Sequence, residues 1–406
     1  MASRVLMILG AGRGQVSMIR TAIEDGLEVV AIDPSPLAPG LKLAHHKYTY
    51  DLSDNQSILT VAHKHQISGV ATLGADYPMP LLGTICAQLR LPGPTIDTVA
   101  CATNKRLMRA AFVDFGVPCP RSIPVKNLIE AVEAISSIGT ECIIKPVMSQ
   151  GGRGITRVAA DTAAQEIATA FRIAMRETRA DGVLVEEFVD GPEFSVEAIT
   201  WRKNTHVVAV TDKLTSGAPY YVELGHSQPS RFSPEQINSL REAAVSAVEA
   251  LGIDNAPSHT ELRLTSTGPL IMETAARLGG GFITSHLVPL SCGVNIVRAA
   301  IQVALGEAPD LTVRDLGGSA IRFLKTSPGV VSAITGLNEV RSMSGVVEAE
   351  SYVCPGDRVI PLRDATGRIG HVICVGKDVE EAVRRVQAAY ERISISTHDN
   401  AQPFQS

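Results

Sequence analysis

Two glutamates flank a Gly-Pro turn in the second half of the chain, Glu261 before the turn and Glu273 after it. If the turn spans residues 265–269, Leu264 pairs with Leu270 across two strands and Glu261 pairs with Glu273. Cross-strand partners share a face with their Cβ atoms ~5 Å apart, and two ionised carboxylates there repel each other unless a cation lies between them. A hard divalent ion such as Mg²⁺ binds carboxylates and leaves room for phosphate oxygens. The alternative is an exposed hairpin with two solvated glutamates.

Arg277 lies four residues beyond Glu273 and can supply a second positive charge near the pair. It is followed by Gly279, Gly280 and Gly281, which present no side chains. In one interpretation these glycines leave room for a bulky substrate, and Gly280 and Gly281 then line its site. In the other they only permit a tight turn.

A lysine and a glycine-rich turn lie close together in the middle of the chain. Lys145 ends an apolar strand, and Gly151, Gly152 and Gly154 follow it. Such a loop can approach phosphate groups through its backbone N–H groups, although glycine hairpins without a ligand also exist. The spacing is not GxxxxGK[ST], which excludes a P-loop.

The next predicted strand ends in Glu186-Glu187-Phe188-Val189, and a long strand starts at Glu193. The edge of the first strand can offer a carbonyl and an N–H to adenine, and Glu193 can accept hydrogen bonds from ribose hydroxyls. The alternative is an amphipathic strand pair with solvated acidic side chains.

Taken together, these residues resemble the ATP-grasp superfamily in their order and spacing, over about residues 98–310. The resemblance rests on a set that also includes Lys105, which lies in a predicted helix: Lys105, Lys145, the glycine loop, Glu186 to Val189, Glu193, Glu261, Glu273 and Arg277. It implies an ATP-dependent enzyme that uses Mg²⁺ or Mn²⁺. The flanking regions fit the three-part layout of the biotin-carboxylase-like members.

The resemblance assigns nucleotide contacts to particular residues. Lys105 and Lys145 would contact the α- and β-phosphates, and Gly151 to Gly154 would form a mobile lid over the γ-phosphate. The Glu187 carbonyl and the Val189 N–H would hold adenine.

The resemblance also assigns the metal and the transferring group. Glu261 and Glu273 would hold magnesium ions, and Arg277 would stabilise the phosphoryl group in transfer. Many members carry Asn two residues after the second metal glutamate, where this chain has Ala275. This difference implies that one metal ion binds more loosely.

Two further stretches, residues 220–226 and 275–281, look like those of the bacterial L-amino-acid ligases. In that family, acidic and histidine residues at the positions of Glu223 and His226 help to hold the amino-acid substrates. A carboxylate can bind a substrate ammonium group, and histidine can orient it or assist proton removal. The alternative for His226 is a loop histidine bonded to backbone. Arg277 could also hold a substrate carboxylate.

The predicted function is an ATP-dependent carboxylate–amine ligase. It would join an amino-acid carboxylate to an amine, with another amino acid as the expected amine, through an acyl phosphate, giving ADP and phosphate. The candidate catalytic residues are Arg277, Lys145 and His226. Within the superfamily, the alternative is a carboxylase-type or purine-pathway enzyme that uses bicarbonate or formate. Outside it, the alternatives are a non-catalytic nucleotide-binding module and a dehydrogenase, since Gly10 to Gly14 after the first strand imperfectly matches a dinucleotide fingerprint.

Three domains of α/β character must position these residues. Strands at 4–9, 28–32 and 69–73, alternating with helices, predict a parallel Rossmann-like domain over residues 1–97. The ATP-grasp domain is expected over 98–310, with a lid subdomain at about 120–190, and an α+β domain over 311–406. Within the second domain we expect one helix from Thr98 to about Gly116 and a loop over 215–230.

The composition limits the partners of the chain. It has 406 residues, 45% of them hydrophobic, a net charge of −5 and only 4% aromatic residues, which argues against nucleic-acid binding. Seven dispersed cysteines fit free thiols in a reducing compartment. No stretch has the length of a membrane span. We therefore expect a cytoplasmic enzyme with small-molecule amino-acid substrates, and the resemblance implies a homodimer.

Overall fold

The N-terminal region folds into a four-stranded parallel sheet. The computed structural model describes residues 4–218 and 220–398. Its first sheet has the strand order β3-β2-β1-β4 and is packed between helices. The strands are β1 (Val5–Leu9), β2 (Glu28–Ile32), β3 (His46–Tyr48) and β4 (Gly69–Ala71), and the helices of this region are α1 (Val16–Glu24), α2 (Asn55–His65) and α3 (Met79–Leu89). Every residue of β1 is buried, as expected for a parallel strand with both faces covered. The predicted parallel sheet is confirmed.

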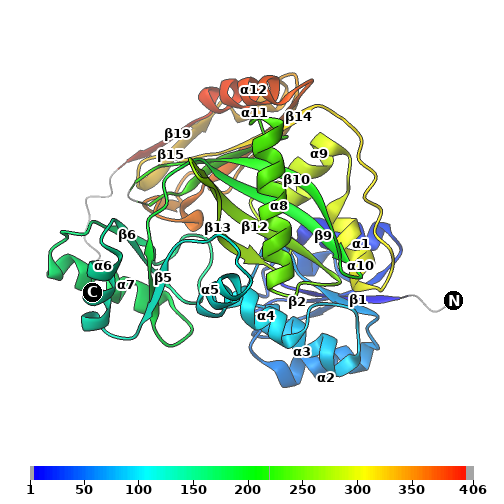
Figure 1. The fold of residues 1–406 in the computed structure, drawn as a ribbon. Coiled ribbons are helices and arrows are strands. Elements are labelled where there is room, and N and C mark those ends of the chain that lie inside the picture. The colour runs from blue at the N-terminus through cyan, green and yellow to red at the C-terminus, as the bar shows by residue number, and fades with distance from the viewer. Residues whose placement is uncertain (1–3, 219, 399–406) are drawn as a thin grey trace, which may run out of the picture.

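An eight-stranded antiparallel sheet forms the centre of the molecule. Its order is β13-β12-β9-β10-β11-β14-β18-β16, and α8 (Pro234–Ala250) packs across β10, β12 and β13 (Figure 1). The strands are β9 (Glu193–Trp201), β10 (Asn204–Thr215), β11 (Glu223–Gln228), β12 (Ala256–Thr265), β13 (Gly268–Ala275), β14 (Gly318–Phe323), β16 (Val346–Ser351) and β18 (Gly370–Gly376). The β11–β14 pairing carries this sheet across position 310, so the proposed division at that point cuts a continuous sheet.

A smaller antiparallel sheet lies to the left in Figure 1, with the order β5-β8-β6-β7. It is built from β5 (Ser122–Val125), β6 (Cys142–Pro146), β7 (Thr156–Val158) and β8 (Val183–Glu187), with α6 (Leu128–Ile138) and α7 (Ala164–Glu177) packed on it. These elements enclose a hydrophobic cluster of their own, which includes Ile144, Ile167 and Val185. The predicted lid region therefore has its own core.

The last part of the chain completes the large sheet and adds a three-stranded one. The order of the latter is β17-β15-β19, and the remaining elements are β15 (Gly329–Thr335), β17 (Arg358–Val359), β19 (Ser394–His398), α9 (Val288–Cys292), α10 (Ile296–Ala304), α11 (Leu337–Arg341) and α12 (Val379–Arg392). No single described helix is long and apolar enough to cross a membrane, and one bent pair, Ile283–Cys292 with Ile296–Ala304, reaches that length and composition together. All seven cysteines are free.

The helix expected from Thr98 to Gly116 is two helices, which corrects the prediction. The first is α4 (Ile96–Thr103), which contains the proposed domain boundary at 97/98, and the second is α5 (Lys105–Asp114). Asn104 separates them in an extended conformation, and its side chain accepts hydrogen bonds from the N–H groups of Arg106 and Leu107. Asparagine is a strong N-cap because it satisfies otherwise unpaired helix donors. The break places Lys105 at the start of α5.

The loop expected over 215–230 contains strand β11, which is a second correction. β11 pairs with β10 on one side and with β14, almost 100 residues further along the chain, on the other. Its sequence, Glu-Leu-Gly-His-Ser-Gln, lacks the β-branched and aromatic residues that favour strands. Hydrogen bonds to β10 and β14 stabilise β11 as a strand, although its composition does not favour one.

The glutamate hairpin has the predicted pairing at its functional end and a different one at its tip. Glu261 lies opposite Glu273, but Leu264 pairs with Pro269 rather than with Leu270, and the turn is shorter than predicted because Thr265 pairs with Gly268. A bulge between Glu261 and Leu262 restores the match. Because a shift of one residue moves side chains to the other face, this bulge is what brings the two carboxylates to one face.

Candidate active site

One cavity lies between the lid sheet, the large sheet and the N-terminal region. It is lined by most of the residues that the sequence singled out: Lys105, Lys145, Gly151, Gly152, Glu186, Glu187, Phe188, Val189, Glu193, Glu223, Glu261, Glu273 and Arg277. Of the predicted site residues, Gly154, His226, Gly280 and Gly281 are not among those that line it. The cavity also gathers residues that the sequence did not single out, among them Asp76, His259, Arg263 and Arg368.

Each hairpin carboxylate already contacts an ammonium group. Glu261 accepts a hydrogen bond from Nζ of Lys213 at 2.8 Å, and Glu273 accepts one from Nζ of Lys105 at 2.8 Å. The two glutamate side chains nevertheless remain 30% and 23% exposed, and both face the cavity. Carboxylate oxygens open to a cavity suit Mg²⁺, which usually takes one or two carboxylates and keeps other positions for water or phosphate. The residues present therefore fit the predicted metal.

Lys213 contacts three of the predicted glutamates, a role that its local sequence does not indicate. Its side chain is only 1% exposed, and its Nζ lies 3.1 Å from Glu193, 2.8 Å from Glu223 and 2.8 Å from Glu261. Burial lowers the pKa of this ammonium, but the three carboxylates outweigh burial and raise the pKa well above its ordinary value. Lys213 is therefore a fixed positive charge below the floor of the cavity. In the sequence it is a single lysine near the end of a strand.

His259 is a second positively charged group, and it lies behind Glu261, a predicted metal ligand. Its Nδ1 lies 2.5 Å from Oε1 of the buried Glu197, and its Nε2 lies 3.3 Å from Oε1 of Glu261. Burial lowers the pKa of the imidazole, but Glu197 and Glu261 outweigh burial and raise it to about 9. At neutral pH the ring is therefore protonated and orients the Glu261 carboxylate.

A buried ion triad connects α5 to the lid sheet. Both oxygens of Glu186 accept hydrogen bonds from Arg109, at 2.8 and 3.1 Å, and Lys145 also bonds to this carboxylate. Burial raises the pKa of Glu186, but the two cations outweigh it and hold the pKa at about 2. Burial is the largest influence on Lys145 and lowers its pKa to about 8. Glu186 therefore holds Lys145, the candidate phosphate contact, in position, and its own carboxylate is already paired with two cations of the chain.

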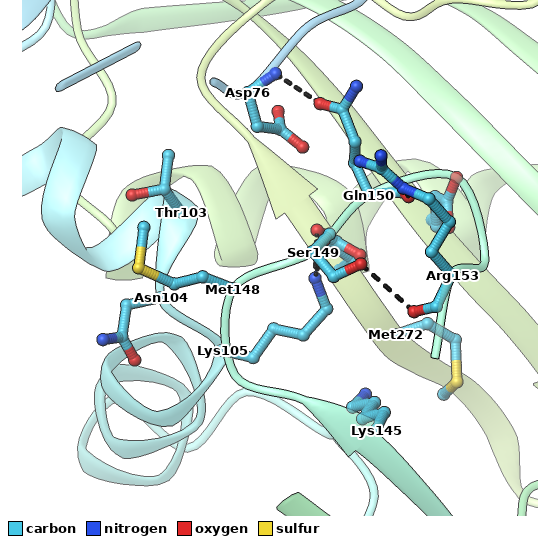
Figure 2. A network of polar contacts seen from close by, with 12 residues as sticks. Asp76, Thr103, Asn104, Lys105, Lys145, Met148, Ser149, Gln150, Arg153 and Met272 are labelled. Atoms are coloured by element: carbon cyan, nitrogen blue, oxygen red, sulfur yellow. Dashed lines mark hydrogen bonds and ion pairs between the residues drawn. The ribbon is translucent and has the colours of Figure 1, made fainter. Parts of the chain in front are cut away.

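The glycine loop reaches from the lid to the N-terminal region. Figure 2 shows Nζ of Lys105 pointing to the Ser149 carbonyl, which it contacts at 2.9 Å, and Gln150 reaching the backbone N–H of Asp76 at 2.6 Å. The three predicted glycines adopt φ values of +69°, +79° and +76°, which side chains disfavour. At Gly154 an added Cβ would also lie 2.7 Å from the Pro146 ring. The three glycines that marked this loop in the sequence are therefore required by its backbone conformation.

Arg277 is held at the cavity by a residue from the N-terminal region. Its Nε donates to Oδ1 of Asp76 at 2.6 Å, and its Nη1 donates to the Leu278 carbonyl at 3.2 Å. Asp76 thus contacts Arg277 through its carboxylate and the glycine loop through its backbone. Because the two residues are 201 positions apart, sequence spacing gave no sign of this pair.

The predicted adenine hinge lines one wall of the cavity. The N–H groups of Glu187 and Phe188 bond to the carbonyls of Arg121 and Glu141, at 2.9 and 2.8 Å. The Val189 carbonyl accepts from Arg263 at 2.7 Å, and Arg263 also donates to Glu193 at 3.1 Å. The adenine contacts expected of the Glu187 carbonyl and the Val189 N–H stay predictions.

The aromatic ring of the hinge, Phe188, lies between an arginine and a tyrosine. The Arg157 guanidinium lies 3.8 Å from the centroid of the Phe188 ring, and Tyr221 lies 5.8 Å from it, centroid to centroid. Phe188 and Tyr221 give the wall a partly apolar, aromatic surface, which suits a purine ring.

His226 and the glycines after Arg277 pack beneath the cavity. His226 is buried against Phe323, and burial is the main cause that lowers its pKa to about 3, so the imidazole is neutral. A Cβ at Gly281 would lie 2.9 Å from the His226 ring, and one at Gly279 would lie 2.6 Å from the His259 ring. The missing side chains therefore make room for two histidines, a reason for these glycines that neither sequence-based interpretation includes. Roles for His226, Gly280 and Gly281 in substrate binding stay predictions.

Glu223 is closer to the cavity than His226 but is already paired. Arg368, from the C-terminal region, donates to its Oε2 at 2.7 Å and to its backbone carbonyl at 3.2 Å. Burial raises the pKa of Glu223, but Lys213 and Arg368 are among the groups that outweigh burial and hold the pKa well below its ordinary range. A substrate ammonium at this carboxylate would therefore share it with two cations of the chain itself.

Comparisons with known proteins agree with this geometry. Residues 138–286 match the sequence profile of the ATP-grasp domain, and residues 322–398 match that of L-amino acid ligase C-terminal domain 2. The chain is 28% identical over 335 residues to protein y4rH of Sinorhizobium fredii, an alignment that covers 81% of this chain and 68% of that protein. It is 27% identical over 405 residues to the formate-dependent phosphoribosylglycinamide formyltransferase of Ignicoccus hospitalis, with 96% and 95% covered. The L-amino acid ligase of Bacillus licheniformis has the same fold, with a TM-score of 0.86 at 22% identity over 98% of this chain and 99% of that chain.

Proposed function

We propose that this chain, which matches the ATP-grasp domain over residues 138–286 and has the fold of an L-amino acid ligase, joins the carboxylate of an amino acid to an amine, preferably that of a second amino acid. The predicted superfamily, the ATP-grasp fold and an ATP-dependent ligase that uses ATP and Mg²⁺ are thereby confirmed. The proposal concerns the substrates and the course of the reaction, because the relatives include both amino-acid ligases and a formate-dependent enzyme.

The reaction we propose has two steps. An oxygen of the substrate carboxylate attacks the γ-phosphorus of ATP, the bond from that phosphorus to the β–γ bridging oxygen breaks, and ADP leaves. The amine nitrogen then attacks the acyl carbon of the acyl phosphate, phosphate leaves with the C–O bond electrons, and the nitrogen loses a proton. Such catalysis depends on positioning and on neutralising the charge of the moving phosphoryl group.

Side chains of this chain supply that charge around one cavity. The observation that carries the proposal is that Lys105, Glu261, Glu273 and Arg277 all line it. Glu261 and Glu273 would hold Mg²⁺, which supplies Lewis-acid polarisation of phosphate oxygens. Lys105 and Arg277 bring positive charge to the same space, and the lid loop would exclude the water that would otherwise hydrolyse an acyl phosphate. The matched C-terminal domain supports amino acids as the substrates.

Nucleotide affinity is expected to depend on pH through Lys145. Burial lowers the pKa of its ammonium to about 8, and phosphate oxygens bind the protonated form. The dissociation constant of ADP should therefore be constant from about pH 6.5 to 7.5 and rise above pH 8, by at most about tenfold per pH unit. Calorimetric titration with ADP across this range measures it. Lys145→Arg, which keeps its proton throughout, should flatten the rise, and an equal rise in both proteins would contradict the assignment.

A substrate screen tests the proposed reaction directly. Purified enzyme with ATP and Mg²⁺ is incubated with amino acids singly and in pairs, and ADP and the coupled product are measured. We expect ADP release that needs an amino acid and a matching dipeptide or amide detected by mass spectrometry. ADP release that depends on bicarbonate alone, or on formate with phosphoribosylglycinamide, would replace the proposal with the alternative that the formyltransferase relative supports. The homodimer expected from the resemblance stays a prediction.

A further inference from the structure

A second group of ligating side chains lies outside the cavity, where the C-terminal strands meet the helical turn Ile283–Leu287. Oε1 of Glu348 on β16 is 3.3 Å from Nε2 of His371 on β18, and its Oε2 is 3.2 Å from Nε2 of His286 in the turn. Glu350 brings a second carboxylate from β16. One donor atom from each of Glu348, Glu350 and His371 lies within 4.8 Å of the others.

His371 is fully buried and is oriented for a ligand on one side. Its Nδ1 lies 2.8 Å from the hydroxyl of Tyr352, and its ring is stacked on Phe282 with the centroids 4.2 Å apart. Its Nε2 makes no hydrogen bond of acceptable geometry within the described part of the chain. A buried polar atom is normally paired, so this nitrogen, aimed at the Glu348 carboxylate, indicates that a partner belongs between them.

We propose that Glu348, Glu350 and His371 bind a borderline divalent cation such as Zn²⁺, and that His286, which lies 3.2 Å from the second oxygen of Glu348, moves in as the fourth ligand. Tetrahedral zinc with bonds of about 2.0–2.1 Å to nitrogen and oxygen separates neighbouring donors by roughly 3.3 Å, which matches the 3.3 Å between Oε1 of Glu348 and Nε2 of His371. Two imidazoles favour zinc, whereas Mg²⁺ prefers oxygen donors throughout. A hydrogen bond from Nδ1 of His371 to Tyr352 would leave the lone pair of Nε2 for the metal, as outer partners of metal-bound histidines commonly do.

The surrounding charge is compatible with a divalent cation. Arg13, from the N-terminal region, lies 3.1 Å from Oε1 of Glu350 and stacks over the Tyr352 ring at 4.1 Å. This guanidinium offsets one of the two carboxylates, and the other, that of Glu348, is not offset by a lysine or arginine among the described contacts.

The bound cation would fasten three separate parts of the chain. β16 and β18 belong to the C-terminal region, and His286 belongs to the turn that follows the Arg277 segment. The metal would therefore stabilise, from outside the nucleotide cavity, the segment that follows Arg277. The inference does not depend on the proposed substrates.

Zinc binding by the full-length chain, stripped with a chelator, tests the site. The Glu273→Gln variant serves as the background because it weakens metal binding at the nucleotide cavity. Isothermal titration with ZnCl₂ should show one site per chain that millimolar MgCl₂ does not displace, and Co²⁺ should give the intense visible bands of a tetrahedral complex. Glu348→Gln and His286→Ala should each weaken zinc binding at least about tenfold, as changes near metal sites commonly do.

A second cluster of similar composition provides the matched control. Glu28, His46 and His65 also bring donor atoms within 4.8 Å of one another, at the edge of the N-terminal sheet. His46→Ala should leave zinc affinity and the cobalt spectrum unchanged. The inference is overturned by the absence of zinc binding, by an octahedral cobalt spectrum, or by a loss of binding in His46→Ala but not in His286→Ala. His286 is only partly buried, so its variant is expected to fold.

Discussion

Replacing Glu273 by Gln is expected to lower kcat by about a thousandfold or more while the protein stays folded. A metal ion contributes several kcal/mol to stabilising a phosphoryl transition state, and each 1.36 kcal/mol is tenfold in rate. The amide oxygen of Gln can still accept the 2.8 Å hydrogen bond from Lys105, so the melting temperature should change little. Steady-state ADP release with the substrates found in the screen, together with thermal unfolding, measures both effects.

The control for this variant is Glu307→Gln, which changes an exposed glutamate paired with Arg4. It should keep full activity. Glu261→Gln should also impair turnover, and raising the Mg²⁺ concentration should partly restore whichever variant keeps one strong metal ligand. Full activity of Glu273→Gln at ordinary Mg²⁺ concentrations would refute the metal assignment.

Replacing Arg109 by Met is expected to lower the free energy of unfolding of the ligand-free enzyme by about 3–5 kcal/mol. Removing one partner of a buried ion pair leaves the other charge uncompensated, which is the costly case. Arg109 makes two hydrogen bonds to the buried Glu186 and a third to the Met272 carbonyl at 2.6 Å. Only Lys145 would then neutralise Glu186, and the Met272 carbonyl would lose its donor. Urea unfolding followed by circular dichroism measures the change.

A second substitution separates the buried charge from simple loss of packing. Arg109→Lys, which keeps a cation beside Glu186, should lose less stability than Arg109→Met, because the buried carboxylate stays compensated. As a matched control, Arg298→Met breaks an exposed pair with Asp25, in which the side chains are 39% and 28% exposed, and should cost at most about 1 kcal/mol. Equal losses in Arg109→Met and Arg298→Met would contradict the assigned role of the triad.

The contrast between Glu273 and Arg109 shows what the sequence could predict. The Glu261–Glu273 pairing follows from a short turn and the two-residue period of strands, both of which are local. Arg109 meets a glutamate 77 positions away, and its helix begins at a break at Asn104 that the apolar pattern does not reveal. Nothing in the local sequence of α5 distinguishes this arginine from a solvated one.

Lys213 and His226 show that the surroundings of a side chain are hard to predict from local sequence. Lys213 is a single lysine in a strand until β9, β11 and β12 bring three glutamates around its ammonium. His226 was singled out because its segment resembles that of a ligase family, yet the turn at Gly281 and the Phe323 ring cover it. A family motif can identify a segment, whereas burial of a particular side chain depends on elements far away in the sequence.

Asp76 couples the position of Arg277 to that of the glycine loop, because it contacts both. Its carboxylate holds Arg277, and its backbone N–H holds Gln150 in the glycine loop. A ligand that draws Arg277 away from Asp76 changes the same residue that anchors the loop, and movement of the loop changes the residue that restrains the arginine. Linkage requires the two effects to be equal in free energy. Closure of the glycine loop and placement of Arg277 would then shift together as one equilibrium. Asp76, which sets this equilibrium, comes from the N-terminal region, whereas the loop and the arginine do not.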